Sequence, residues 1–219
     1  LLYGIQDTST SPSSFKVREV FLNGSFPPVM YLLQSSVSVS DVSGGDYGNM
    51  NGINISFSDD DILYNYPVES HVYVLDRRTK QTKVVDADSR FTKNVAGKCR
   101  SRSDYSQWIR HAVENPHFYD IIYLPEREMY VRLHLGEHTF DATLDADALM
   151  DDRNLYMTLF DKEFNIVGEC SLATHRYNYY TAWTAVGKGL LVFVDNLMSS
   201  ETKTDRLEMD IIELSLIHI

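Results

Sequence analysis

Residues 118–135 read FYDIIYLPEREMYVRLHL, and this stretch decides the fold class. Two runs rich in Tyr, Ile, Val and Leu flank the polar residues Glu126, Arg127 and Glu128. β-branched and aromatic side chains suit a pleated, half-buried surface, and a short polar segment between two such runs is typical of a hairpin turn. The stretch therefore predicts two antiparallel strands joined by a tight turn.

The same strand–turn–strand pattern recurs along the chain. Three-residue polar turns also stand at 59–61 and 187–189, each between two apolar runs, and a second kind of hairpin is predicted at 71–85 and again at 156–170. Helical patterning is weak: 103–113 predicts one helix that Asp104 could cap, and 145–153 predicts a single turn within a loop. Each repeat reads as a four-stranded antiparallel meander, so the fold class is all-β.

A four-stranded sheet that repeats along a chain is typical of a β-propeller, whose sheets, or blades, pack face to face around an axis. The repeats amount to about three and a half blades. A closed ring needs about four to eight, so we expect a fragment of a propeller. We expect the chain to begin with the outer half of a blade at 1–22 and a connecting loop region at 23–52. A blade at 53–88 and an insert with a short helix at 89–117 follow. The last two units are a blade at 118–172, with a loop at 136–153, and a third full blade at 173–213.

Residues 214–219, LSLIHI, match what a transposase adaptor used in sequencing libraries encodes in one reading frame. We therefore expect these six residues to be non-native and residues 1–213 to be part of a longer protein. A natural β-rich end of the chain is the alternative.

Charge and composition exclude some classes of function. The net charge is −11, with 20 basic and 31 acidic residues, which argues against a nucleic acid or an anionic membrane as a partner held by bulk charge. No apolar run reaches the roughly 18 residues of a membrane-spanning helix. The two cysteines, Cys99 and Cys170, are too few for a disulfide framework or a Cys-based metal site, although one bond between them is conceivable.

Motifs that would bind a cofactor or a metal are weak or absent. The Gly-rich segment 43–52 lacks the spacing of a phosphate-binding loop. The carboxylates at 145–152 could form a loose calcium loop, but Leu149 and Met150 occupy positions where an EF-hand has an oxygen ligand and a glycine. We expect no cofactor, no metal and no catalytic residue.

The best argument for a site comes from the expected architecture. In a propeller the segments that lead into the first strand of each blade converge at one face, around the central channel. In this chain those segments are polar and aromatic, which suits a binding surface. The candidate binding residues are Asn51, His117, Tyr119, Asn178 and Tyr180. The alternative is that these tyrosines only pack between blades.

The region 98–110 is locally basic, with Lys98, Arg100, Arg102 and Arg110. It is either a solvated insert or a docking patch for an acidic partner.

Residues 64–76, YNYPVESHVYVLD, carry a family resemblance. The stretch resembles one in the TolB-like six-bladed β-propeller lipoproteins of unknown function from bacterial cell envelopes, and strand and turn patterns extend the resemblance over about 53–213. The resemblance implies a location in the cell envelope, in the periplasm or as an outer-membrane lipoprotein, with membrane attachment only through a lipid anchor that this chain lacks. It supplies no catalytic residue.

The function expected from these observations is non-catalytic. We expect a cell-envelope propeller that binds a protein partner or a small ligand at the channel face, and no nucleic acid. The alternative is a propeller-type hydrolase, lactonase-like or glycan-active, with a metal in the central channel. A purely structural spacer is a third interpretation.

Overall fold

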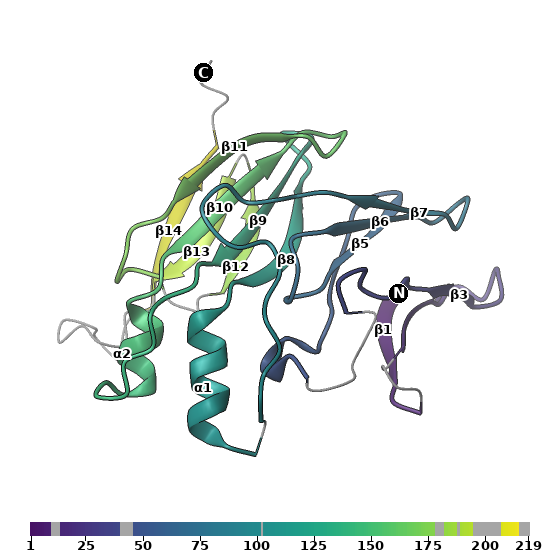
Figure 1. Cartoon of the computed structure of the whole chain (residues 1–219). Coiled ribbons are helices and arrows are strands. Elements are labelled where there is room, and N and C mark those ends of the chain that lie inside the picture. Colours follow the sequence, from purple (N-terminus) through teal and green to yellow (C-terminus); the bar gives the residue numbers. More distant parts are fainter. Residues whose placement is uncertain are drawn as a thin grey trace.

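The computed structural model describes residues 1–9, 14–39, 46–101, 103–177, 182–187, 189–194 and 207–214. It confirms the all-β prediction, since these residues form four separate antiparallel sheets of three or four strands (Figure 1). None of the four described sheets closes into a barrel, because each runs from one edge strand to the other in chain order.

The first sheet contains β1 (Leu2–Asp7), β2 (Ser14–Glu19) and β3 (Val29–Leu32). The second contains β4 (Asn54–Phe57), β5 (Asp61–Asn65), β6 (Val72–Asp76) and β7 (Thr82–Val85). The third contains β8 (His117–Leu124), β9 (Met129–Leu135), β10 (Leu155–Phe160) and β11 (Ile166–Ser171). The fourth contains β12 (Trp183–Val186), β13 (Gly189–Val194) and β14 (Glu208–Glu213).

The predicted hairpins are present. The polar turns at 59–61, 126–128 and 187–189 join β4 to β5, β8 to β9 and β12 to β13, and all three strand pairs are antiparallel. The two hairpins of the second kind are β6–β7 and β10–β11. Alternation of apolar and polar side chains, interrupted by polar turns, was therefore sufficient to locate these strands.

The segment 23–52, for which we expected a connecting loop, contains two elements. Strand β3 pairs with β2, and η1 (Gly48–Met50) is one turn of 3-10 helix. Strand β3 follows Pro27 and Pro28 and has only four residues, so its pattern is too short to stand out in the sequence. Residues 1–32 thus supply three strands rather than two.

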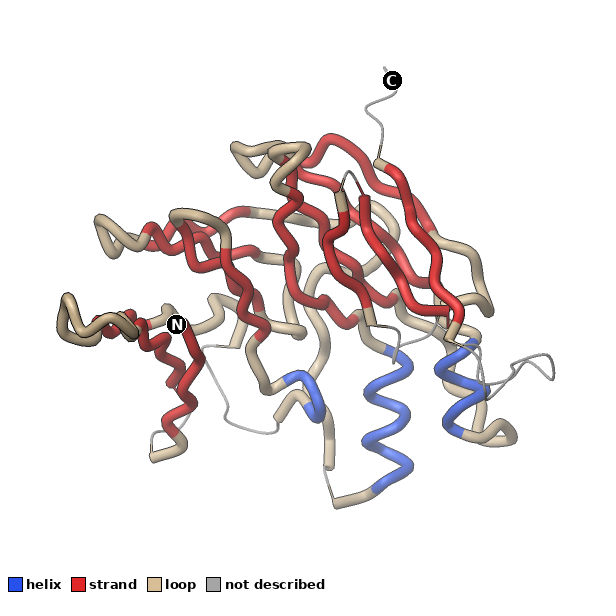
Figure 2. The backbone as a smooth tube through the Cα atoms, turned by 180° about the vertical axis from the view of Figure 1, so that it is seen from behind, coloured by secondary structure: helices blue, strands red, loops and turns tan. Residues whose placement is uncertain are grey.

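Two α-helices begin where aspartate caps them. The carboxylate of Asp104 accepts a hydrogen bond from the Gln107 N–H at 3.2 Å and starts α1 (Tyr105–Glu114), as predicted. Asp145 accepts from the Ala148 N–H at 2.8 Å and starts α2 (Ala146–Asp151). The two α-helices lie at the same end of the sheets, together with η1 (Figures 1 and 2). We call this end the helix-bearing face.

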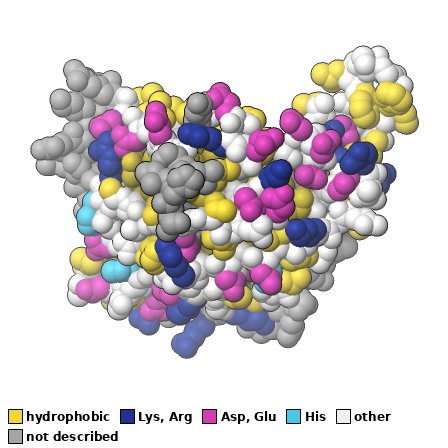
Figure 3. Space-filling view, turned by 90° about the horizontal axis from the view of Figure 1, so that it is seen from above, with side chains coloured by type: hydrophobic (Ala, Val, Ile, Leu, Met, Phe, Trp, Pro, Cys, Tyr) yellow, Lys and Arg dark blue, Asp and Glu magenta, His cyan; other side chains and the backbone are white. Residues whose placement is uncertain are grey.

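Each pair of successive sheets buries an apolar cluster between its members. One cluster joins the first and second sheets, a second joins the second and third, and the third joins the third and fourth sheets and includes both α-helices. Burial of apolar surface between the sheets is therefore the main force that holds them together. The opposite end of the molecule, drawn in Figure 3, exposes interspersed acidic and basic side chains.

Within the described residues, no helix is both long enough and apolar enough to cross a bilayer.

Candidate functional site

The site is built around the start of β8, the first strand of the third sheet. Its register against β9 shifts between Phe118 and Ile121, so Tyr119 and Asp120 form a β-bulge. Strand β8 contacts both β4 and β12, the first strands of the neighbouring sheets. A bulge at this position re-aims side chains at the place where three sheets meet.

The second sheet supplies hydrogen bonds to the free edge of β8. The amide nitrogen of Asn54 donates to the Phe118 carbonyl at 3.0 Å, and that of Asn65 approaches the same oxygen at 3.4 Å. The Ser56 hydroxyl donates to the Ile121 carbonyl. Buried backbone groups need such partners, so these three side chains fix the bulge in place.

Three rings lie next to one another on this strand and on β12. The His117 and Tyr119 ring centres are 4.8 Å apart, and Tyr119 meets Trp183 edge to face at 4.7 Å. Burial lowers the pKa of His117 to about 3 and raises the pKa of Tyr119, so both rings are neutral at physiological pH. The group is a neutral, largely buried aromatic cluster shared by two sheets.

Asp120 adds a carboxyl group that the sequence analysis missed. Burial raises the pKa of this carboxyl above its usual range, and a hydrogen bond from Trp183 partly opposes the shift. In the sequence, the two successive residues Tyr119 and Asp120 interrupt the alternation of β8, and this interruption was the signal for a bulge.

A buried arginine connects the start of β8 to the end of β9. The Arg153 guanidinium donates to the Gly136 carbonyl at 2.8 Å and to the Asn115 carbonyl at 2.7 Å, and its side chain is almost fully buried. Burial lowers its pKa to about 10, which leaves it charged at neutral pH. Arg153 therefore fixes the distance between the segment after α1 and the segment after β9.

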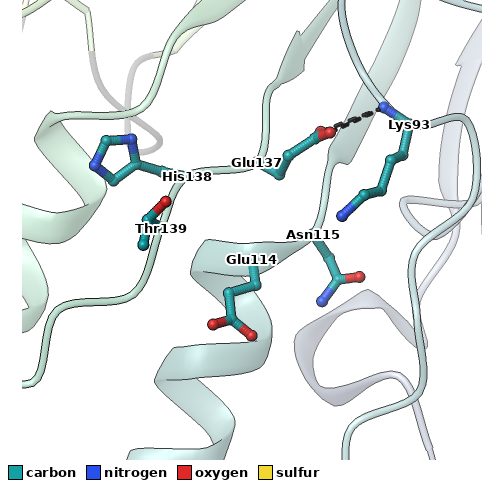
Figure 4. Close-up of a pocket in the computed structure, with 6 residues that line it drawn as sticks. All are labelled: Lys93, Glu114, Asn115, Glu137, His138 and Thr139. Carbon is teal, nitrogen blue, oxygen red and sulfur yellow. Dashed lines mark hydrogen bonds between the residues drawn. The ribbon is translucent and has the colours of Figure 1, made fainter.

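An open groove lies between these two segments on the helix-bearing face. It has a volume of about 540 Å³, which is in the range typical of small-ligand sites, and its lining is polar. The backbone N–H of His138 donates to the Val113 carbonyl at 2.8 Å and holds the two walls together. The lining residues, drawn in Figure 4, are Lys93, Glu114, Asn115, Glu137, His138 and Thr139.

The structure brings together only some of the predicted binding residues. His117 and Tyr119 are in contact, and in the sequence they follow Asn115, which lines the groove. The side chain of Asn51 instead bonds locally, since its oxygen accepts from the Tyr47 N–H and its nitrogen donates to the Gly48 carbonyl. Asn178 and Tyr180 lie outside the described residues. The groove itself was not predicted, because it combines three segments that are distant in the sequence.

The acidic segment 145–152 and the basic region 98–110 have local structural roles in the part of the chain that the structure describes. In the acidic segment 145–152, Asp145 caps α2, and Asp151 accepts a hydrogen bond from His175 at 2.8 Å. Among the described residues, no three His, Cys, Asp or Glu side chains gather as a metal site requires. In the basic region, the Arg110 guanidinium lies over the Phe140 ring at 4.7 Å, and Arg102 is outside the described residues. Cys99 and Cys170 are both free thiols.

Comparison with known proteins gives a family and a fold. The family model described as "Domain of unknown function (DUF4221)" matches residues 28–171. A crystal structure of a DUF4221 family member from Bacteroides vulgatus superimposes with a TM-score of 0.63 at 18% identity, over 78% of this chain and 47% of that chain. The chain thus spans about half the length of that protein. No curated protein matches the sequence.

These matches correct the resemblance drawn from residues 64–76. The assignment to TolB-like lipoproteins is wrong, because the family model that matches most of the chain is DUF4221 and the matching crystal structure belongs to the same family. In the structure, the quoted stretch is β5, a turn and β6. Such a strand-and-turn pattern reports local structure, which unrelated β-sheet families share.

Proposed function

We propose, for a chain that belongs to the DUF4221 family, that it is a non-catalytic binding module whose helix-bearing face holds a polar small ligand or a segment of a partner protein. The observation that carries this proposal is the groove of about 540 Å³ at the end of α1, whose lining includes Asn115, just before β8 in the chain. Concave sites with a few fixed polar groups are where proteins usually bind small molecules.

The rigidity of the groove supports a binding role. Arg153 and the His138–Val113 hydrogen bond fix both walls, so a ligand would not have to order them. Preorganisation of this kind reduces the entropy lost on binding. The polar lining favours a ligand that carries charges or hydrogen-bonding groups over an apolar one.

A screen of polar metabolites and short peptides by protein-observed NMR would test the proposal. We expect hits to shift the signals of the groove residues, and Thr139→Trp to abolish binding because an indole would fill the groove. Thr79→Trp is the matched control, since Thr79 is also exposed but lies in the β6–β7 turn. Binding that survives Thr139→Trp would contradict the proposal, and so would a loss that is equal in Thr79→Trp.

The alternative is a propeller-type hydrolase, lactonase-like or glycan-active, with a metal in the central channel. The same protein preparation can test it. Turnover of lactone or glycan substrates that requires a divalent cation and stops on chelation would favour it over the binding module. A location in the cell envelope stays a prediction, which fractionation of cells that express the whole gene would check.

For the fold, we propose that the four sheets are successive blades of a β-propeller. Two observations support this: strands follow one another in order within every sheet, and β8 contacts the first strand of the sheet on either side. A crystal structure of a longer protein that includes this chain would test it. Sheets arranged around a common axis are expected, and a linear stack would contradict the proposal.

A further inference from the structure

Two side chains of opposite charge line the groove and have no partner among the residues that the structure describes. Lys93 comes from the loop before α1, and Glu114 is the last residue of α1. Neither the Lys93 ammonium nor the Glu114 carboxylate makes a hydrogen bond or an ion pair with any residue that the structure describes, and the two do not pair with each other. In Figure 4 the Lys93 side chain points toward Asn115, and Glu114 lies on the other side of that residue.

Two other strong hydrogen-bonding groups of the groove, the side chains of Asn115 and Glu137, are already used within the protein. The Asn115 side chain accepts from the Gly97 N–H at 2.6 Å and donates to the His111 carbonyl at 2.8 Å. Both carboxylate oxygens of Glu137 accept from the Lys93 backbone N–H, at 3.3 Å each. These contacts shape the groove, and Lys93 and Glu114 are the charged side chains of its lining whose ends have no partner among the described residues.

We propose that the groove binds a small zwitterion, an amino acid or a short peptide with free termini, whose ammonium lies against Glu114 and whose carboxylate lies against Lys93. This inference rests on the proposed binding function and names its ligand class. A ligand with charges at both ends satisfies both groups, whereas an ion of one sign leaves the opposite group unpaired. Complementary charge of this kind gives specificity even where it adds little affinity.

Dialanine is a suitable probe, together with its N-acetylated form and its C-terminal amide. Each modification removes one terminal charge and leaves the rest of the molecule in place. For the unmodified protein, NMR titration should show that either modification weakens binding about two- to fivefold, the range expected for one solvent-exposed ion pair.

Two variants assign each terminus to its partner. In Glu114→Gln, N-acetylation should cost no further affinity while amidation still does, and Lys93→Met should show the reverse. Both positions are solvent-accessible, so we expect both variants to fold, which their thermal melting would verify. Lys162→Met, in the exposed β10–β11 turn, is the matched control and should behave like the unmodified protein.

Equal affinity for the three probes overturns this inference, as does a failure of all three to bind at millimolar concentration. A penalty for acetylation that persists in Glu114→Gln, or one for amidation that persists in Lys93→Met, overturns it as well. The proposed binding function would survive any of these results if a different ligand bound and Thr139→Trp abolished that binding.

Discussion

The guanidinium carbon of Arg132 lies 4.8 Å from the centre of the Phe118 ring, and both side chains are completely buried. Arg132 donates to the carbonyls of Ser70 and of Ala87, so a residue of β9 is bonded to the backbone of the loop between β5 and β6 and of the loop after β7. Burial lowers the pKa of Arg132 to about 9. The Arg132 guanidinium therefore keeps its charge at neutral pH, although the contact between the second and third sheets is otherwise largely apolar.

We expect Arg132→Ala to lower the free energy of unfolding by about 3–5 kcal/mol, because two buried carbonyls lose their donor and a cavity opens next to Phe118. Urea denaturation would measure the change. Arg78→Ala, in the exposed β6–β7 turn, should change stability by less than about 0.5 kcal/mol. A loss in Arg132→Ala as small as in this control would mean that Arg132 does not hold the sheets together.

His134 should make the protein sensitive to acid. Burial, together with the nearby Arg132 charge, lowers its pKa to about 3, whereas an unfolded histidine titrates near 6.5. Below about pH 6.5 the unfolded chain therefore binds a proton that the folded chain does not. The stability that the neutral ring contributes is fully present above that pH and is lost toward pH 3, by about 1.4 kcal/mol per pH unit.

His134→Gln isolates this contribution. Denaturation curves between pH 6.5 and pH 4 should show that the dependence of stability on pH is shallower in the variant by about one proton. The carboxylates titrate equally in both proteins and cancel in the comparison. An unchanged slope would show that His134 is not held neutral in the folded state.

Two glycines of one hairpin should respond differently to alanine. A Cβ at Gly189 would lie 2.4 Å from the Ile212 carbonyl oxygen on β14. A Cβ at Gly187 would meet only the Glu126 carboxylate, at an ordinary contact distance of 3.9 Å, and Gly187 has a positive φ of 48°. We expect Gly189→Ala to destabilise the fourth sheet by about 3 kcal/mol or more and Gly187→Ala by about 1 kcal/mol. Thermal melting of both variants is the test, and equal losses would contradict the close approach of β13 and β14.

Sequence patterns predict those parts of the fold that depend on residues close together in the chain. Local signals were sufficient for the hairpins and for α1, because alternation, polar turns and the Asp104 cap involve residues close together in the sequence. Strand β3 was missed because four residues after two prolines carry little periodicity. The family was assigned wrongly on residues 64–76 for a related reason, since a local pattern cannot distinguish one β-sheet family from another.

The candidate site could be predicted only in part, because it depends on residues that are far apart in the sequence. The pairing of His117 with Tyr119 follows from their positions on one strand. The groove needs Lys93, Glu114 and Glu137 from three segments, and their convergence depends on Arg153 and on backbone contacts that no spacing in the sequence reveals. The environment of Asp120 likewise depends on a bulge and on a tryptophan from the next sheet.

The side chains that cap β8 also bear on how the protein behaves at high concentration. A free strand edge can recruit a strand from another molecule and seed aggregates. Asn54, Asn65 and Ser56 occupy carbonyls on that edge, so β8 offers few sites for such recruitment. Replacing these three short polar residues with alanine would expose the edge, and fibril growth or turbidity in the resulting protein would be the visible symptom.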